Sequence, residues 1–271
     1  MDKLILWHNH FYNQSASILK ENVKKLFEKL QIPIAEIWEI ACENRLLPLV
    51  NEVEYYGKIL QALNNAKKQK MKLLVCDSQS LLAIKRVFEK YFMHSNFKEE
   101  LNKKIGEIDI LELEDAFVFA PEIVLQAFVR DNQKRTWEGF KCAFLLDREL
   151  ESMVKETYIV EKFENLLGVK IYPFYKDSYD YLLHINKDMA YKMGGKDYYE
   201  MVDCGVDFIM TPNIGNFELL DGHSKKIKKN AGRDDLEVPI LYIPQVFLAL
   251  FKEYNAQDLM FFKHNISPKM L

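Results

Sequence analysis

The chain has 271 residues, of which 49% are hydrophobic and 28% charged, as in an ordinary globular protein. Its formal net charge of −3 excludes a global basic field that would attract nucleic acid or an anionic membrane. No apolar run reaches the roughly 18 residues of a membrane span, and we expect no signal peptide because the N-terminus lacks a basic region and a cleavage site. The four cysteines lie far apart, which predicts no disulfide framework and favours a reducing cytoplasm.

Apolar runs and helical periodicities alternate along the first half of the chain. Short apolar runs predict strands at residues 3–8, 32–38, 72–76 and 108–113. Apolar positions three or four residues apart predict helices at residues 15–30, 52–68 and 78–92. Strands that alternate with helices predict an α/β fold with a mainly parallel sheet flanked by helices.

The same order recurs in the second half. Strands are predicted at residues 140–146, 169–174, 206–210 and 240–243, and helices at residues 149–167, 180–202, 216–229 and 245–254. The helix at residues 180–202 carries an expected interruption at Gly194 and Gly195. LFEKLQIPIAEI in the first half is similar to KFENLLGVKIYPF in the second. This repetition predicts two pseudo-repeated α/β lobes, residues 1–125 and 135–271, joined near residues 121–135.

The stretch GVDFIMTPNIGNFELLDGH, residues 205–223, predicts a buried strand, a Thr-Pro-Asn corner and a helix that opens at Asn213. With VPILYIPQVFLALF and DLMFFKHNISPKML, it resembles the cysteine-rich CCG-domain proteins typified by the HdrB protein of heterodisulfide reductase. The resemblance spans nearly the whole chain, and in these stretches the order and spacing of residues agree with it. The resemblance implies the paired-lobe fold and, as partners, the protein subunits of a redox or respiratory complex.

Each half of those proteins supplies a lone cysteine, a Cys-Cys pair and a Cys-x-x-Cys motif, whose thiolates ligate iron–sulfur clusters. By this resemblance, Cys142 keeps the lone position of the second half. The pair falls within residues 177–180, which contain no cysteine, and Asn213 and Asn216 stand at the Cys-x-x-Cys positions. The resemblance therefore implies the fold without an intact iron–sulfur cluster, and we expect no cofactor.

In the first half, His10 takes the lone position, while Cys42 and Cys76 remain from the pair and the last motif. His8 and His10 alternate on one strand, so both point to the same face. Two imidazoles and two thiolates are a usual zinc set, so a zinc or iron ion at His8, His10, Cys42 and Cys76 is one hypothesis. The alternative is that these are pocket residues with no ligand.

A second candidate site is the corner after the strand at residues 206–210. Free N–H groups at a helix start favour a small anionic ligand. The alternative is that the asparagines only cap the helix. Cys204, at a helix end, is expected to be a buried inert thiol. The candidate ligand-binding residues are Cys142, Asn213, Asn216, His223, Tyr242 and Gln245.

The leading functional hypothesis is a non-catalytic HdrB-like binding or accessory protein. One alternative is a metal-dependent or redox enzyme that uses the His8, His10, Cys42 and Cys76 set. Another is a binder of a small anion at the Asn213 corner. Neither a Walker loop nor a nucleophile elbow is present in the sequence, so nucleotide and serine-hydrolase chemistry have no support.

Overall fold

The computed structural model describes residues 3–40, 46–128, 136–233 and 237–269. The strands are β1 (Lys3–His8), β2 (Ile34–Glu39), β3 (Met71–Val75), β4 (Phe117–Phe119), β5 (Lys141–Asp147), β6 (Lys170–Lys176), β7 (Phe208–Thr211) and β8 (Ile240–Tyr242). The α-helices are α1 (Asn13–Lys29), α2 (Leu47–Val50), α3 (Glu52–Lys68), α4 (Ser78–Met93), α5 (Ser95–Ile105), α6 (Ala120–Ala127), α7 (Glu151–Thr157), α8 (Ile159–Leu167), α9 (Lys187–Asp203), α10 (Ile214–Phe217), α11 (Ser224–Ala231) and α12 (Ile243–Leu248).

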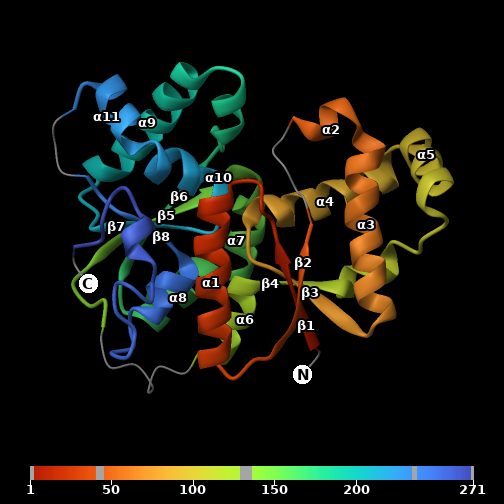
Figure 1. Cartoon of the computed structure of the whole chain (residues 1–271), viewed down its shortest axis with the longest axis horizontal. Coiled ribbons are helices and arrows are strands. Elements are labelled where there is room, and N and C mark those ends of the chain that lie inside the picture. Colours follow the sequence, from red (N-terminus) through yellow and green to blue (C-terminus); the bar gives the residue numbers. More distant parts are fainter. Residues whose placement is uncertain (1–2, 41–45, 129–135, 234–236, 270–271) are drawn as a thin grey trace.

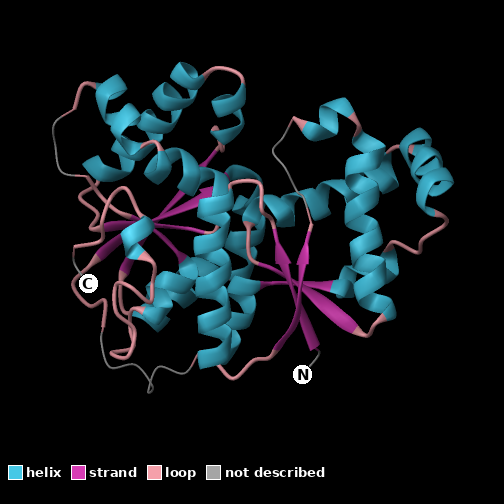
Figure 2. Ribbon diagram, viewed as in Figure 1, coloured by secondary structure: helices cyan, strands magenta, loops and turns pink. Residues whose placement is uncertain are grey.

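The described strands form two four-stranded parallel sheets (Figure 1). Their orders are β2-β1-β3-β4 and β6-β5-β7-β8, so the two sheets share one topology. Helices flank both sheets (Figure 2). The predicted α/β class with two pseudo-repeated lobes is confirmed.

Burial follows the position of each strand in its sheet. The central strands β1 and β5 are buried from their second residue onward, since helices cover both faces of a parallel sheet. The edge strands β2 and β6 are more exposed. Side-chain caps fix several helix starts: the side chain of Asn51 accepts a hydrogen bond from Glu54 N, and that of Asn186 from Met189 N.

One predicted strand was wrong. Residues 111–116 form a 3-10 helix, and the fourth strand of the first sheet, β4, follows it at Phe117–Phe119. The apolar residues Ile110 and Leu113 suggested a strand at residues 108–113, and both are indeed buried. However, Ile110 lies in a bend and Leu113 in the 3-10 helix, which contacts α3. A short apolar run does not distinguish these cases.

Several helix predictions also needed correction. The helix expected at residues 149–167 is broken at Tyr158, whose φ of 52° is left-handed, into α7 and α8. Conversely, α9 runs through Gly194 and Gly195 without interruption. A Cβ on Gly194 would lie 2.7 Å from Leu219 Cδ2, so this glycine permits close helix packing. The helix expected at residues 216–229 is divided into the end of α10, a π-helix (Glu218–Gly222) and α11. The closing helix α12 ends at Leu248, before the predicted end at residue 254. Helix α5 was not predicted.

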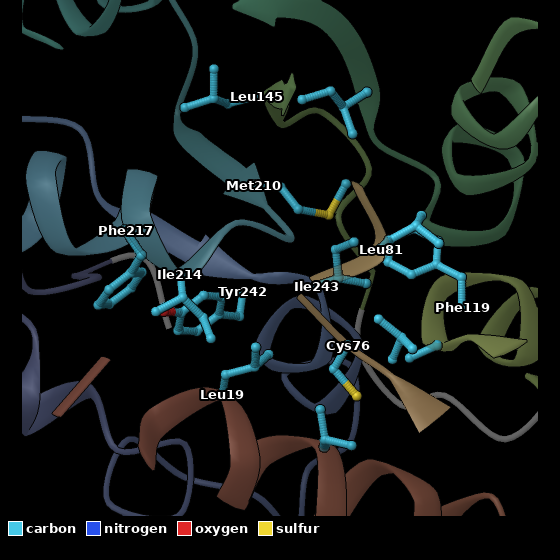
Figure 3. Close-up of a cluster of buried hydrophobic side chains, with 14 of the residues drawn as sticks. Leu19, Cys76, Leu81, Phe119, Leu145, Met210, Ile214, Phe217, Tyr242 and Ile243 are labelled. Carbon is cyan, nitrogen blue, oxygen red and sulfur yellow. The ribbon is translucent and has the colours of Figure 1, made fainter. Parts of the chain in front are cut away.

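The two lobes share one continuous core. Helix α1 follows β1 in sequence but contacts α10 and α12 of the second lobe (Figure 1). Figure 3 shows Leu19 of α1 and Cys76 of the first lobe within the same apolar cluster as Met210 and Ile243 of the second. This shared core holds the carboxyl ends of β3 and β7 against each other.

Candidate functional site

A buried polar network lies where the strand-to-helix corners of the two lobes meet. Ser78 N donates a hydrogen bond to Pro212 O (3.1 Å), and Ile214 N donates to Asp77 Oδ1 (3.0 Å). Each corner therefore binds the backbone of the other. We call this network the interlobe seam; its members are Asn9, Asp77, Ser78, Gln79, Ser80, Asp147, Ser178, Asp180, Asn213 and Asn216.

Asp77 is the N-cap of α4, and its carboxylate is surrounded by donors. Besides Ile214 N, it accepts bonds from Ser80 N (3.1 Å), Ser80 Oγ (3.1 Å) and Asn9 Nδ2 (3.5 Å). Burial raises the pKa of Asp77 to about 6, the hydrogen bonds from Ile214 and Ser80 act against this rise, and the nearby Asp147 adds to it. Asp77 is thus an internal anion held at the start of α10.

Asp147 at the end of β5 is fully buried and joins the same two corners. It accepts hydrogen bonds from Ser78 Oγ and from Asn213 Nδ2, the latter at 2.8 and 3.0 Å to its two oxygens. Asn213, in turn, caps α10 by accepting a bond from Asn216 N (2.8 Å). Each lobe therefore contains one Asp–Asn pair. In the first lobe, Asn9 follows β1 and Asp77 caps α4. In the second lobe the residue types are exchanged, because Asp147 ends β5 and Asn213 caps α10.

A further group of hydrogen bonds in the seam connects Gln79 of the first lobe to the second lobe. Its Nε2 lies 3.2 Å from Ser178 Oγ, 3.1 Å from Asp180 Oδ1 and 3.4 Å from Asn213 Oδ1. Ser178 Oγ donates to Asp180 Oδ1 (2.7 Å) and lies 3.1 Å from Asn216 Oδ1. The Asn216 Nδ2 group is buried and has no hydrogen-bond partner among the described residues.

Asp180 also connects the seam to Tyr12 and, through the Tyr12 hydroxyl, to His184. It accepts a hydrogen bond from the hydroxyl of Tyr12 at 3.0 Å. The pKa of Tyr12 is raised mainly by burial and, to a smaller extent, by the negative charge of Asp180. His184 Nε2 lies 3.5 Å from the same hydroxyl. Gly215 makes room for Asp180, because a Cβ there would lie 2.5 Å from Asp180 Oδ2.

The six predicted ligand-binding residues make different kinds of contact in the structure. Asn213 and Asn216 meet in the seam, but Cys142 lies fully buried in β5, where burial raises the pKa of its thiol. His223 Nδ1 lies 3.4 Å from the Tyr191 hydroxyl. The remaining two support the core: the Tyr242 ring stacks on Phe217 at 4.4 Å, and Gln245 Nε2 donates to Leu259 O at 2.8 Å. The ligand role of these residues stays a prediction.

Of the predicted metal ligands, the structure describes His8, His10 and Cys76, and the register of β1 with β3 places His8 beside Cys76 in sequence position, since Trp7 pairs with Val75. The rings of His8 and His10 lie 6.4 Å apart, whereas Cys76 lies in the apolar cluster of Figure 3, where burial raises the pKa of its thiol. Cys42 lies outside the described residues. Among those residues, no three His, Cys, Asp or Glu side chains are grouped to hold a metal ion. The metal site stays a prediction, while Cys204 is exposed, so its expected burial was wrong.

Asp77, Asp147 and Gln79 were not among the site residues predicted from the sequence. A signal was present, because Asp77 and Asp147 each stand at or just after the end of a buried strand, where polar side chains of an α/β protein meet. The members of the seam are oxygen and amide groups bonded to one another. Soft thiolates are what iron–sulfur clusters require, so this donor set does not fit such a cluster.

Comparison with known proteins supports the resemblance in the second lobe. Residues 179–265 match the HdrB-like C-terminal domain, as expected of an HdrB-like protein. No curated protein matches the chain. None of the described helices has the length and apolarity needed to cross a bilayer.

Among solved structures, a hypothetical protein from Helicobacter pylori has the same fold, with a TM-score of 0.81 and 22% identity. The match covers 99% of this chain but 53% of that one, so the chain spans about half the length of its relative. An aspartate racemase homologue from Pyrococcus horikoshii matches over 97% of this chain and 99% of its own, at 10% identity and a TM-score of 0.35. That last score is too low to indicate a shared fold.

Proposed function

We propose that this chain is a non-catalytic HdrB-like binding or accessory protein, in which a polar seam has replaced the cluster ligands. The observation that supports this is the hydrogen bonding of Ser178, Asp180, Asn213 and Asn216. They occupy the region that the resemblance assigns to cluster cysteines, and their polar groups bind one another and the first lobe. Groups used in this way hold the lobes together.

Metal content of the purified protein tests the loss of the cluster. Protein purified anaerobically without a His-tag is expected to be colourless, with neither iron nor sulfide in stoichiometric amount, because the seam offers no thiolate. The measurement is iron and sulfide analysis together with the visible absorption spectrum. Brown protein with several iron atoms per chain would contradict the proposal.

The accessory role is tested by association. HdrB-like proteins act within multi-subunit complexes, so we expect this chain to co-purify with a flavin or iron–sulfur protein of a redox complex. Affinity purification from the native organism at native expression level, followed by size-exclusion chromatography, provides the measurement. Elution of the chain alone at its own mass, 32.0 kDa, would contradict an accessory role.

A further inference from the structure

The two edge strands at equivalent positions of the two sheets differ in how they are protected. In β6, Pro173 interrupts the backbone donors and Lys170 and Lys176 stand at the two ends. Proline and lysine are common means of blunting an exposed edge. In contrast, β2 has the sequence IAEIWE, with no proline or lysine, and none of its residues is fully buried.

Within the described residues, the outer backbone of β2 is open to a further strand. Ile40 N donates to His8 O at 3.2 Å, so the groups that alternate with Ile40 along the strand face β1. Ile37 and Glu39 are out of phase with it and direct their N–H and C=O groups away from β1. No described strand pairs with this side of β2. The side chain of Ile37 is 42% exposed, a large apolar group beside this free edge.

A groove runs beside this edge between β2 and α3. Its volume is about 610 Å³, within the range of ligand-binding clefts. We call it the β2 groove; it is lined by His10, Ile37, Trp38, Glu39 and Ile40 on one side and by Lys58, Gln61, Ala62, Asn65 and Gln69 on the side of α3. His10 Nδ1 is buried there without a hydrogen-bond partner in the described part of the chain.

We propose that the outer edge of β2, with the β2 groove, binds an extended basic segment of a partner protein, which adds as a further parallel or antiparallel strand. Strand addition beside a helix gives affinity through backbone hydrogen bonds and specificity through alternate side chains. Glu39, in the lining of the β2 groove, and Glu36, whose Oε2 accepts a hydrogen bond from Trp38 Nε1 (2.7 Å), supply the charge. Neither carboxylate forms an ion pair within the described residues. A second copy of this chain would present the same acidic strand, so it lacks the complementary charge of a basic segment.

The test uses a defined probe and an intrinsic signal. The probe is acetyl-Lys-Val-Lys-Val-Lys-Val-amide, compared with the acidic peptide in which glutamate replaces lysine and with a basic peptide N-methylated at every residue, which blocks both of its edges. Of the three tryptophans, Trp7 and Trp137 are buried at 3% and 2% exposure, so fluorescence changes report mainly on the half-buried Trp38. We expect saturable binding of the basic peptide and none of the other two.

Two variants test the geometry and the charge separately. Ile37→Pro removes an outward N–H and is expected to weaken binding at least about tenfold, while Ile37→Val keeps the donor and is the matched control. Glu36→Lys combined with Glu39→Lys is expected to reverse the preference, so that the acidic peptide binds. The circular dichroism spectrum of each variant confirms that it is folded.

Several results would overturn the proposal. They are the absence of saturable binding, equal affinity for basic and acidic peptides, binding of the N-methylated peptide, or unchanged affinity in folded Ile37→Pro. Concentration-dependent dimer formation that Ile37→Pro abolishes would instead assign the edge to a second copy. The proposal extends the binding role given above, but a failed titration here leaves the iron analysis and the association experiment unaffected.

Discussion

Asp77 and Asp147 concentrate two buried carboxylates at the meeting point of the lobes. The hydrogen bonds given above reach them from backbone N–H, hydroxyl and amide donors. Such donors favour the ionised carboxylate, whereas burial disfavours it. For Asp77 the effect of burial is the larger of the two, so its pKa is raised. The network is therefore sensitive to single-atom changes in its carboxylates.

Asp77→Asn is expected to destabilise the protein by about 1–3 kcal/mol at pH 7.5, because the NH2 group that replaces one carboxylate oxygen would face either the donor of Ile214 or those of Ser80 and Asn9. Chemical denaturation measures the loss. The control is Asp115→Asn, since Asp115 is exposed and outside the seam, and a change within about 0.5 kcal/mol is expected there. A loss of stability no larger than that of the control would show that Asp77 does not hold the lobes together.

The elements predicted with success are those whose signal is local. The strands at residues 3–8 and 72–76 and the helix at residues 52–68 lie within a residue or two of β1, β3 and α3. Failures occurred where tertiary contacts decide: Gly194 and Gly195 usually interrupt a helix, but here they admit Leu219 and Ile227 of neighbouring helices.

The site was predictable in part for the same reason. Asn213 was identified as a helix cap from its Thr-Pro-Asn corner, which is a local signal, and it does cap α10. That Asp77 accepts a hydrogen bond from Ile214, far away in the sequence, depends on how the lobes pack. No periodicity or spacing within one lobe contains that information.

Gly215→Ala is expected to distort the start of α10, because the added Cβ would lie 2.5 Å from Asp180 Oδ2 and Asp180 is bonded to Gln79, Ser178 and Tyr12. Overpacking of this kind destabilises by about 1–3 kcal/mol, which a thermal melt detects. In the control Gly57→Ala the nearest atom, Ile105 Cγ2, is 3.3 Å away, so its melting temperature should change less. Equal shifts in the two variants would show that this contact is relaxed.

The chain as a whole is closed by its C-terminal segment. Asp221, in the π-helix, accepts hydrogen bonds from Asn265 N (2.9 Å) and Ile266 N (3.1 Å). Asn22 of α1 and Gln245 of α12 both donate to Leu259 O in the same segment. The segment thus ties a helix of the first lobe to the core of the second, so we expect the lobes to unfold together.

Asp221 gives this closure a defined pH dependence. Burial raises its pKa to about 6 from 3.8, with the hydrogen bonds from Asn265 and Ile266 acting against the rise and Glu218 adding to it. A raised folded-state pKa contributes stability below the unfolded pKa and loses it as the pH rises through 6. The stability of the wild type minus that of Asp221→Asn should therefore be larger at pH 4.5 than at pH 7.5, by about 2 kcal/mol. A constant difference in urea denaturation, or one larger at pH 7.5, would contradict this assignment.

The central claim is that oxygen and amide groups at the interlobe seam have taken the place of thiolate ligands. Cluster reconstitution tests it most directly: the reduced protein is incubated anaerobically with ferrous iron and sulfide, desalted, and examined by visible absorption and iron analysis. We predict that the desalted protein returns to its colourless state with no retained cluster, because the seam offers only hard oxygen and amide donors, most of them already hydrogen-bonded. Persistent brown colour with stoichiometric iron and sulfide would contradict the claim.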